Sequence, residues 1–295
     1  MSANKDGRYK PRARWSILLL LIPFAAFFLS FTVPLIWGVS LSLFNSKGVF
    51  VGLLNYVRAI KDASFWSSIT FTLIYSGGVT VVMVVAGFFI ALTINQLGRG
   101  EAVAKTVMLI PWAISLTAWG LLMQVITSQN FGMLNDLLLR LHIISNRISW
   151  LGTEEYARPT VMASRIVKDV WFSSLLFLVA RQTLPVELYE EGKVSGASPW
   201  QAFRFITVPI MRTTMLFVLT ILLIFSLQEF DLIFALTRGG PGFATETAAL
   251  SIFRWGILFG KYELGTAYTA IWSLFISLFV VLVLGRVLIR VIDRK

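Results

Sequence analysis

The chain has 295 residues, of which 57% are hydrophobic and 14% are charged, and its formal net charge is +11. A soluble globular domain carries roughly 25% charged residues, so this composition excludes an ordinary soluble domain and indicates a membrane protein. The absence of cysteine excludes disulfides and thiolate metal sites, and the only histidine, His142, is interpreted as a structural or interfacial residue. The sequence therefore predicts no catalytic residues and no metal site, and the chain is not expected to be an enzyme.

Apolar runs long enough to cross a hydrocarbon core of about 30 Å recur along the chain. Because lipid leaves no water for backbone polar groups, an open chain crosses it as helices. We predict an all-α polytopic membrane protein with one domain over residues 15–290 and short basic tails at 1–14 and 291–295. Its six transmembrane helices are expected at residues 15–41, 67–97, 106–128, 161–181, 213–236 and 264–286. The first is too long for a signal-peptide core and lacks a small-residue cleavage site, so it is expected to be retained.

The fourth predicted span contains Arg165, Lys168 and Asp169. Charges are costly in hydrocarbon and usually face a cavity or one another. Arg165 and Asp169 are four residues apart, so they share one helix face and can pair. Two interpretations stay open: a substrate site, to which Phe172 adds an aromatic surface, or an ion-pair network that joins span four to span five. A third is that Arg165 extends to the outer interface.

Residues 187–209 form a polar, amphipathic loop between spans four and five. Gly196 is a plausible end for a first short helix, because glycine tolerates the left-handed conformation. Ser198, Pro199 and Gln201 form a capping box with proline at the first helical position, so a second helix is predicted to begin at Pro199. Trp200, Phe203 and Ile206 give this helix an apolar stripe, and Pro209 is expected to end the segment.

The fifth predicted span contains a second polar group, formed by Gln228, Glu229 and Asp231. Beyond it, residues 239–242 read Gly-Gly-Pro-Gly, which is a turn cluster. A small-molecule site needs polar donors and acceptors beside an apolar surface, and spans four and five supply both. The neighbouring cations Arg165 and Lys168 favour the hypothesis of a ligand with a carboxylate, sulfonate or phosphate, which Arg165 can bind through charge-assisted contacts.

The distribution of Lys and Arg predicts the orientation. Fifteen lie in the two tails, in the loop after span two, and in or beside the loop of residues 187–209, whereas nine lie in the opposite loops. By the positive-inside rule, both termini and the 187–209 loop are expected in the cytoplasm. The net positive charge is interpreted as contact with anionic lipid rather than nucleic acid, because the basic residues flank the spans and form no stripe with aromatics.

The 187–209 loop resembles the EAA loop of binding-protein-dependent ABC importer permeases: Glu190, Gly196, Ile206 and Pro209 match its Glu, Gly, Ile and Pro. Glu191 and Gly192 stand in place of the two alanines of that motif. Residues 50–56 are similar to the FVGLxNY segment of carbohydrate importer permeases, and residues 230–241 to their FDxIxxLTxGGP pattern. Pro111-Trp112-Ala113 is also family-like. The resemblance covers roughly residues 15 to 290.

The resemblance implies the type I importer permease fold in a bacterial inner membrane. It also implies a second permease subunit, two copies of an ABC ATPase subunit and an extracytoplasmic solute-binding protein, with a sugar as substrate. No cofactor is expected on this chain, because it has no phosphate-binding loop, and ATP and Mg²⁺ are expected on the partner ATPase subunits. The residues expected to couple to the ATPase are Glu190, Gly196, Ala197, Ser198, Trp200, Phe203, Ile206 and Pro209. Those expected to bind substrate are Arg165, Lys168, Asp169, Phe172, Gln228, Glu229 and Asp231.

Three alternatives remain open from the sequence. An ion-coupled secondary transporter would use acids such as Glu229 and Asp231, and uncoupler-sensitive uptake would identify it. A non-transport scaffold or assembly factor would need no charges inside spans and would show no substrate-dependent ATPase activity. An importer permease for a non-sugar solute is the nearest competitor within the family. The sequence does not identify the sugar.

Overall fold

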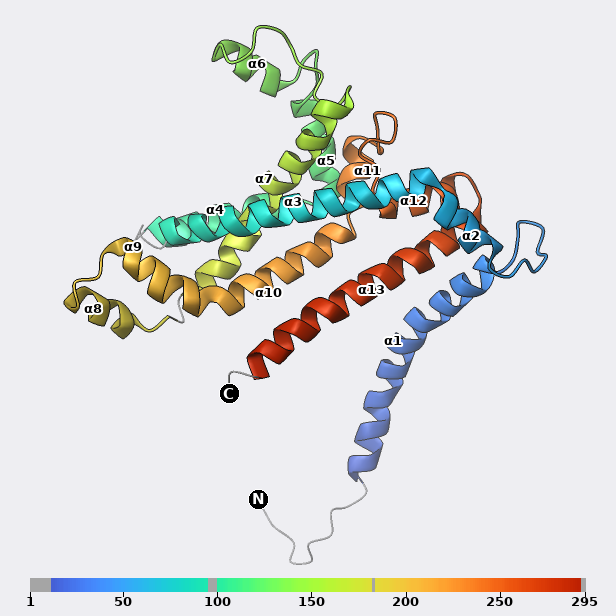
Figure 1. Cartoon of the computed structure of the whole chain (residues 1–295), viewed down its shortest axis with the longest axis horizontal. Helices are drawn as coiled ribbons and strands as arrows, with labels where there is room; N and C mark the ends of the chain where they lie inside the picture. The colour runs from blue at the N-terminus through green and yellow to red at the C-terminus, as the bar shows by residue number, and fades with distance from the viewer. Residues whose placement is uncertain (1–11, 95–99, 182–183, 293–295) are drawn as a thin grey trace, which may run out of the picture.

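The computed structural model describes residues 12–94, 100–181 and 184–292. Within them the protein is helical and has no β-strand, which confirms the all-α prediction. Long helices α3, α10 and α13 run side by side, with the short helices α8 and α9 at one end and α2, α11 and α12 near the other (Figure 1). The helices are α1 (Arg12–Ser42), α2 (Leu54–Lys61), α3 (Ala63–Ile94), α4 (Glu101–Ala113), α5 (Leu116–Ile126), α6 (Met133–Arg140), α7 (Glu154–Arg181), α8 (Val186–Val194), α9 (Pro199–Ala202), α10 (Val208–Leu227), α11 (Asp231–Leu236), α12 (Ala248–Phe253) and α13 (Tyr262–Ile292).

Four segments of the described chain are long and apolar enough to cross a membrane as single helices: Leu21–Ser42, Ala63–Ile94, Pro199–Leu227 and Tyr262–Leu282. A fifth span is possible if α4 and α5, which meet at 90°, act as one broken crossing. Helix α7 has 28 residues and coincides with the fourth predicted span, but it carries charges along its length. Six spans therefore remain a prediction, in which α7 crosses the membrane with its charges covered by other helices.

The third predicted span is not the straight helix expected at 106–128. Pro111 lies near the end of α4, and the backbone of Ile114 and Ser115 is extended. Ser115 then caps α5, its hydroxyl accepting a hydrogen bond from the Ala118 N–H at 3.2 Å. A proline without an N–H donor and a new N-cap together explain why the direction of the chain changes here.

The fifth predicted span is also revised. Its helix begins at Pro199 and ends at Leu227, so the expected end of the segment at Pro209 is wrong. A π-helical turn, Phe203–Thr207, precedes Pro209, and the Val208 N–H bonds to the Phe203 carbonyl five residues back. This shift of the hydrogen-bond ladder lets the helix pass the proline. Gln228, Glu229 and Phe230 lie outside helices, in a break before α11.

Helix α7 packs closely against α3, and the main hydrophobic core lies at this contact. Buried apolar side chains from α3, α7, α10 and α11 form one cluster that includes Tyr75, Met83, Phe177 and Leu222. A smaller cluster joins α2, the start of α3 and α13, and contains Phe65 stacked on Tyr268 with ring centroids 4.0 Å apart. Helix α1 packs against α13 at one end (Figure 1), where its last residue, Ser42, is buried and hydrogen-bonds to Asn55 and Tyr56 of α2. Most of the other described side chains of α1 are exposed.

The predicted orientation can be tested by cysteine labelling, because the chain has no native cysteine. Ser198, before α9, and Ser145, between α6 and α7, are both exposed. We expect Ser198→Cys to react with an impermeant maleimide only after the cytoplasmic side is opened. Ser145→Cys is the matched control and is expected to react in intact cells. Labelling of Ser198→Cys in intact cells would overturn the assignment of this loop to the cytoplasm.

Candidate functional site

A pocket of about 420 Å³ lies where α4, α5, α7 and the break after α10 meet. Its volume is in the range of about 300–1,000 Å³ that is usual for small-molecule sites. The structure brings every residue predicted to bind substrate to its wall: Arg165, Lys168, Asp169, Phe172, Gln228, Glu229 and Asp231. Residues from two predicted spans, separated by more than forty positions, thus line one space.

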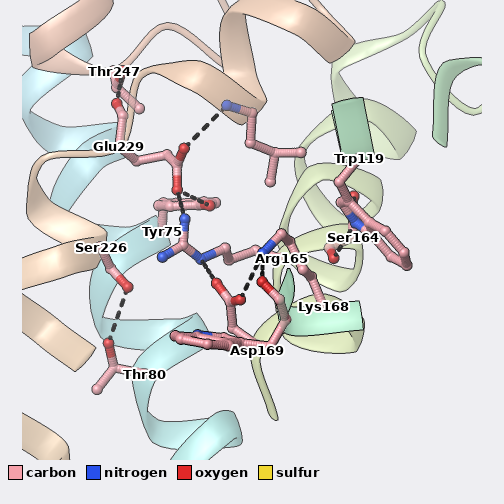
Figure 2. A network of polar contacts seen from close by, with 12 residues as sticks. Tyr75, Thr80, Trp119, Ser164, Arg165, Lys168, Asp169, Ser226, Glu229 and Thr247 are labelled. Carbon is pink, nitrogen blue, oxygen red and sulfur yellow. Dashed lines mark hydrogen bonds and ion pairs between the residues drawn. The ribbon is translucent and has the colours of Figure 1, made fainter. Parts of the chain in front are cut away.

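Arg165 is the centre of the polar wall of this pocket (Figure 2). Its Nε lies 2.7 Å from Asp169 Oδ2, which confirms the predicted pairing across one helical turn. Its Nη1 donates a hydrogen bond to Glu229 Oε2 from the break after α10. The side chains of Arg165 and Glu229 are only 6% and 0% exposed. Glu229 is therefore the partner that joins α7 to the end of the fifth predicted span, as the ion-pair interpretation requires.

Glu229 accepts three further hydrogen bonds, all of them from backbone or uncharged side-chain groups. Tyr75 on α3 donates its hydroxyl to Glu229 Oε2 at 3.3 Å. The Leu232 N–H donates to Oε1 at 3.2 Å, and the Thr247 hydroxyl donates to the Glu229 carbonyl at 2.8 Å (Figure 2). Because a buried carboxylate is costly without donors, these contacts fix both the charge and the backbone of the helix break.

Lys168 differs from Arg165 in how it is paired. Its Nζ donates to Asp169 Oδ1 at 3.2 Å and lies 3.5 Å from the carbonyl oxygen of Trp112. An ammonium group has three donors, so one of them is not used by these two contacts. Lys168 therefore keeps a hydrogen atom for a ligand, and it pairs with one carboxylate, whereas Arg165 pairs with two.

The opposite wall is aromatic. Trp112, at the end of α4, stacks on Phe172 with ring centroids 5.4 Å apart and an angle of 7° between the planes. Phe230 adds a third ring to the lining and stacks on Phe234. Trp171, the neighbour of Phe172, packs against the apolar core and does not line the pocket. The pocket thus combines a flat aromatic surface with paired charges, an arrangement that suits sugar rings and their hydroxyl groups.

The formal charges of the lining cancel almost completely. Arg165 and Lys168 contribute two positive charges, and three carboxylates, from Asp169, Glu229 and Asp231, contribute three negative ones. The spare positive charge expected from span four is thus compensated within the protein. In the part of the chain that the structure describes, no group of three or more His, Asp or Glu residues is arranged to hold a metal ion.

The first part of the 187–209 loop folds as the short helix α8, and the second helix begins at Pro199 as predicted, but it is not short, because it continues to Leu227. Helix α8 ends in a Schellman motif, with Gly196 at φ +76° and the Ala197 and Gly196 N–H groups bonded to the Gly192 and Lys193 carbonyls. Helix α9 begins with the predicted capping box: the Ser198 hydroxyl accepts from the Gln201 N–H, and the Gln201 side chain accepts from the Ser198 N–H at 2.7 Å. Glu190, Gly196, Ser198 and Pro209 are exposed, and Ala197 is half-buried.

The apolar stripe of this loop is partly exposed and partly packed against the spans. Trp200 is 64% exposed and stacks on Phe203, with ring centroids 5.3 Å apart. Phe203 in turn packs against Phe88 and Phe89 of α3, and Ile206 lies close to Gly192 of α8. Phe205, which the stripe did not include, is 69% exposed. The surface that the loop offers to a partner is therefore formed by Trp200 and Phe205, whereas Phe203 and Ile206 fix the loop to the spans.

Comparison with known proteins decides between the classes left open by the sequence. A family model described as the binding-protein-dependent transport system inner membrane component matches residues 83–295. The chain belongs to this family. It is thus an inner-membrane permease subunit, and the resemblance to permeases of ABC carbohydrate importers is confirmed.

This permease is similar over nearly its whole length to several sugar permeases. It is 30% identical to a trehalose/maltose transport system permease of Thermococcus litoralis, over 90% of this chain and 92% of the relative. It is 29% identical to a sulfoquinovosyl glycerol permease of Agrobacterium fabrum, over 90% and 91%. Among solved structures, a bacterial ABC transporter that imports the acidic polysaccharide alginate matches with a TM-score of 0.83 and 25% identity, over 94% and 96% of the two chains.

Two residues of the permease site were not predicted. Trp112 stands in a family-like segment, but a straight helix was predicted over 106–128, whereas α4 and α5 meet at 90° just after Trp112, and this turn places its ring at the pocket. Tyr75 is the other, because a tyrosine within an apolar run is more often a packing residue. The Tyr75 hydroxyl indicates a polar site only when Glu229 is known to lie beside it.

Proposed function

We propose that this permease is a subunit of an ATP-driven, binding-protein-dependent importer of a carbohydrate. The observation that carries the proposal is the pocket, in which seven polar and aromatic residues chosen from the sequence meet beside the Trp112–Phe172 pair. The sugar relatives named above support the same substrate class. Sugars offer hydroxyl groups to paired charges and an apolar ring face to an aromatic surface.

The other subunits of the importer follow from this proposal. A second permease completes the translocation path, and two copies of an ATPase subunit bind ATP and Mg²⁺ in the cytoplasm. An extracytoplasmic binding protein delivers the sugar. The loop of α8 and α9 docks on the ATPase through Trp200 and Phe205, which are exposed, as are the polar residues Glu190 and Ser198 of the same loop. Both termini are cytoplasmic in this arrangement, and the membrane is the bacterial inner membrane.

Two observations bear on the charge of the sugar. The lining carries one more negative than positive charge, which favours a neutral substrate. The similarity to an importer of the acidic polysaccharide alginate favours an acidic one. We propose a neutral sugar as the first candidate and an acidic sugar as the second, with Lys168 as its cation, because Arg165 already pairs with two carboxylates and Lys168 with one.

The functional test is uptake by the complete complex in proteoliposomes. The panel contains trehalose, maltose and lactose as neutral sugars and alginate oligosaccharides as acidic ones. Under the proposal, the sugars of one of these two classes stimulate ATP hydrolysis by the complex. Their uptake requires ATP and is unchanged by a proton uncoupler. Uptake that needs no ATP and stops with the uncoupler would instead establish an ion-coupled transporter. Lys168→Gln is expected to reduce uptake of an acidic sugar much more than that of a neutral one.

The aromatic wall gives a sharper prediction. Trp112→Ala is expected to raise the sugar concentration for half-maximal uptake by about tenfold, equivalent to about 1.4 kcal/mol. The matched control is Trp66→Ala, because Trp112 and Trp66 are both 46% exposed and Trp66 lies outside the pocket. If both variants reached half-maximal uptake at the same sugar concentration, the Trp112–Phe172 pair would not be part of the proposed site.

The coupling surface is tested separately from the pocket. Trp200→Ala is expected to weaken association with the ATPase subunit by about 2–4 kcal/mol, as for a hot-spot tryptophan. The measurement is the amount of ATPase subunit that co-purifies with the permease. Phe243→Ala is the control, since Phe243 is also a largely exposed aromatic but lies in the loop between α11 and α12. Full co-purification with Trp200→Ala would exclude this face of α9 as the docking surface.

A further inference from the structure

A second pocket of about 420 Å³ lies between the α8–α9 loop and the ends of α3 and α7. Its apolar wall includes Leu92 of α3 and Phe203, which packs on Phe88 and Phe89. Its polar wall includes Arg181 at the end of α7 and Lys193 on α8. The lining contains no carboxylate, which distinguishes it from the sugar pocket, where every cation has an acidic neighbour.

The two cations of this pocket have no acidic partner among the residues that the structure describes. In the described part of the chain, no ion pair joins Arg181 or Lys193 to a carboxylate, although five other basic side chains form such pairs. Arg181 is partly covered by its surroundings rather than free in solvent. Two positive charges facing one hollow repel each other, so an anion between them stabilises both.

Two hydroxyl groups complete the polar wall. Tyr189 Oη and Thr207 Oγ1 lie 2.9 Å apart and form a hydrogen bond in which either can donate. Two hydroxyls carry two protons and this bond uses one, so the other O–H is available to a ligand. The guanidinium of Arg181 adds a planar set of donors that matches two oxygens of a tetrahedral anion, and Lys193 adds a compact point charge.

We propose that this pocket binds a phosphate-bearing anion beside the ends of the spans. Several donors from separate segments suit the oxygens of a phosphate, and the apolar wall suits the carbon skeleton attached to it. Basic pockets between spans on the cytoplasmic side are known to accept anionic lipid headgroups. The phosphate group can belong to an anionic phospholipid or to a soluble phosphorylated molecule. Either would link the end of α7 to the loop that is proposed to contact the ATPase.

The test uses the complete purified complex and measures binding of dioctanoyl phosphatidylglycerol by the shift in thermal unfolding temperature. Dioctanoyl phosphatidylcholine, which has no net charge, is the negative probe. The pocket variant is the double substitution Arg181→Gln, Lys193→Gln. Its matched control is Arg204→Gln, Arg212→Gln, which removes the same charge from exposed residues of the same region outside the pocket.

We expect the native complex and the control variant to bind phosphatidylglycerol and the pocket variant to bind it at least tenfold more weakly. Competition by inorganic phosphate would identify a soluble molecule as the natural source, and its failure to compete would identify the lipid. The single variant Lys193→Gln serves if the double variant does not fold, and at least threefold weaker binding is expected. Equal loss in the pocket and control variants, unchanged binding in the pocket variants, or no binding of any probe by the native complex would overturn the proposal.

Discussion

Arg165→Gln is expected to lower the stability of the permease by about 3–5 kcal/mol, the usual cost of removing one member of a buried ion pair. Arg165 is the cation that neutralises Glu229, whose side chain is 0% exposed. Without it, a carboxylate between α3, α7 and α11 keeps only the Tyr75 hydroxyl and the Leu232 N–H. The expected result is a low yield of folded protein and early thermal unfolding of what remains, measured by fluorescence-detected size-exclusion chromatography.

Lys168→Gln is the matched control for Arg165→Gln. It removes a positive charge three residues away in the same pocket, but Asp169 keeps its contact with Arg165. We therefore expect a loss of only about 1 kcal/mol, that of an ordinary hydrogen bond. The double variant Arg165→Gln, Glu229→Gln should recover much of the stability, because it leaves no unpaired charge. An Arg165→Gln protein that folds normally and loses only sugar uptake would show that Arg165 binds substrate instead.

Gly87→Leu is expected to prevent α3 and α7 from packing and so to abolish the folded permease. A Cβ on Gly87 would lie 1.9 Å from Ser173 Oγ and 3.0 Å from the Ser174 backbone nitrogen. If Ser173 rotated away from the new side chain, it would lose the hydrogen bond that its hydroxyl donates to the Met83 carbonyl at 2.6 Å. Overpacking typically costs about 1–3 kcal/mol, and a leucine forced against backbone should reach or exceed the upper end.

Gly77→Ala is the control for this helix contact, since no atom lies within 4 Å of its Cβ position. It lies on the same helix and should leave stability unchanged or raise it by up to about 1 kcal/mol, through better helix propensity. The double variant Gly87→Ala, Ser173→Gly should be more stable than Gly87→Ala alone. If Gly87→Leu gave the same yield and unfolding temperature as Gly77→Ala, the close contact between α3 and α7 would be wrong.

Local features of this chain could be predicted from the sequence because they depend on neighbouring residues. The pairing of Arg165 with Asp169 follows from the helical repeat, and the capping box at Ser198 follows from the spacing of Ser, Pro and Gln. The left-handed conformation of Gly196 is also a local feature of this type. In each case the partners lie within four residues, so no knowledge of the tertiary fold was needed.

Features that depend on breaks in helices could not be predicted in this way. The run at 213–236 has no proline or glycine to indicate that the helix ends at Leu227, and the break is held by Arg165, Tyr75 and Thr247 from distant segments. Conversely, Pro209 looked like an end, yet the π-turn before it carries the helix through. The bend after α4 lies between Pro111 and the Ser115 N-cap, and although these residues are local, their effect on the direction of the chain was not predicted. This bend decides that Trp112 reaches the pocket.

The continuity of the helix from Pro199 to Leu227 makes it a mechanical lever. Its 29 residues span about 43 Å at about 1.5 Å per residue. One end carries Trp200 on the exposed loop, and the other leads directly into Gln228 and Glu229 at the pocket. A tilt of about 5° around the Trp200 end of a rod about 43 Å long moves the far end by about 4 Å. That displacement exceeds the length of an ordinary hydrogen bond, about 3 Å, so a small rotation at the loop is enough to break and remake the hydrogen bonds in the wall of the pocket.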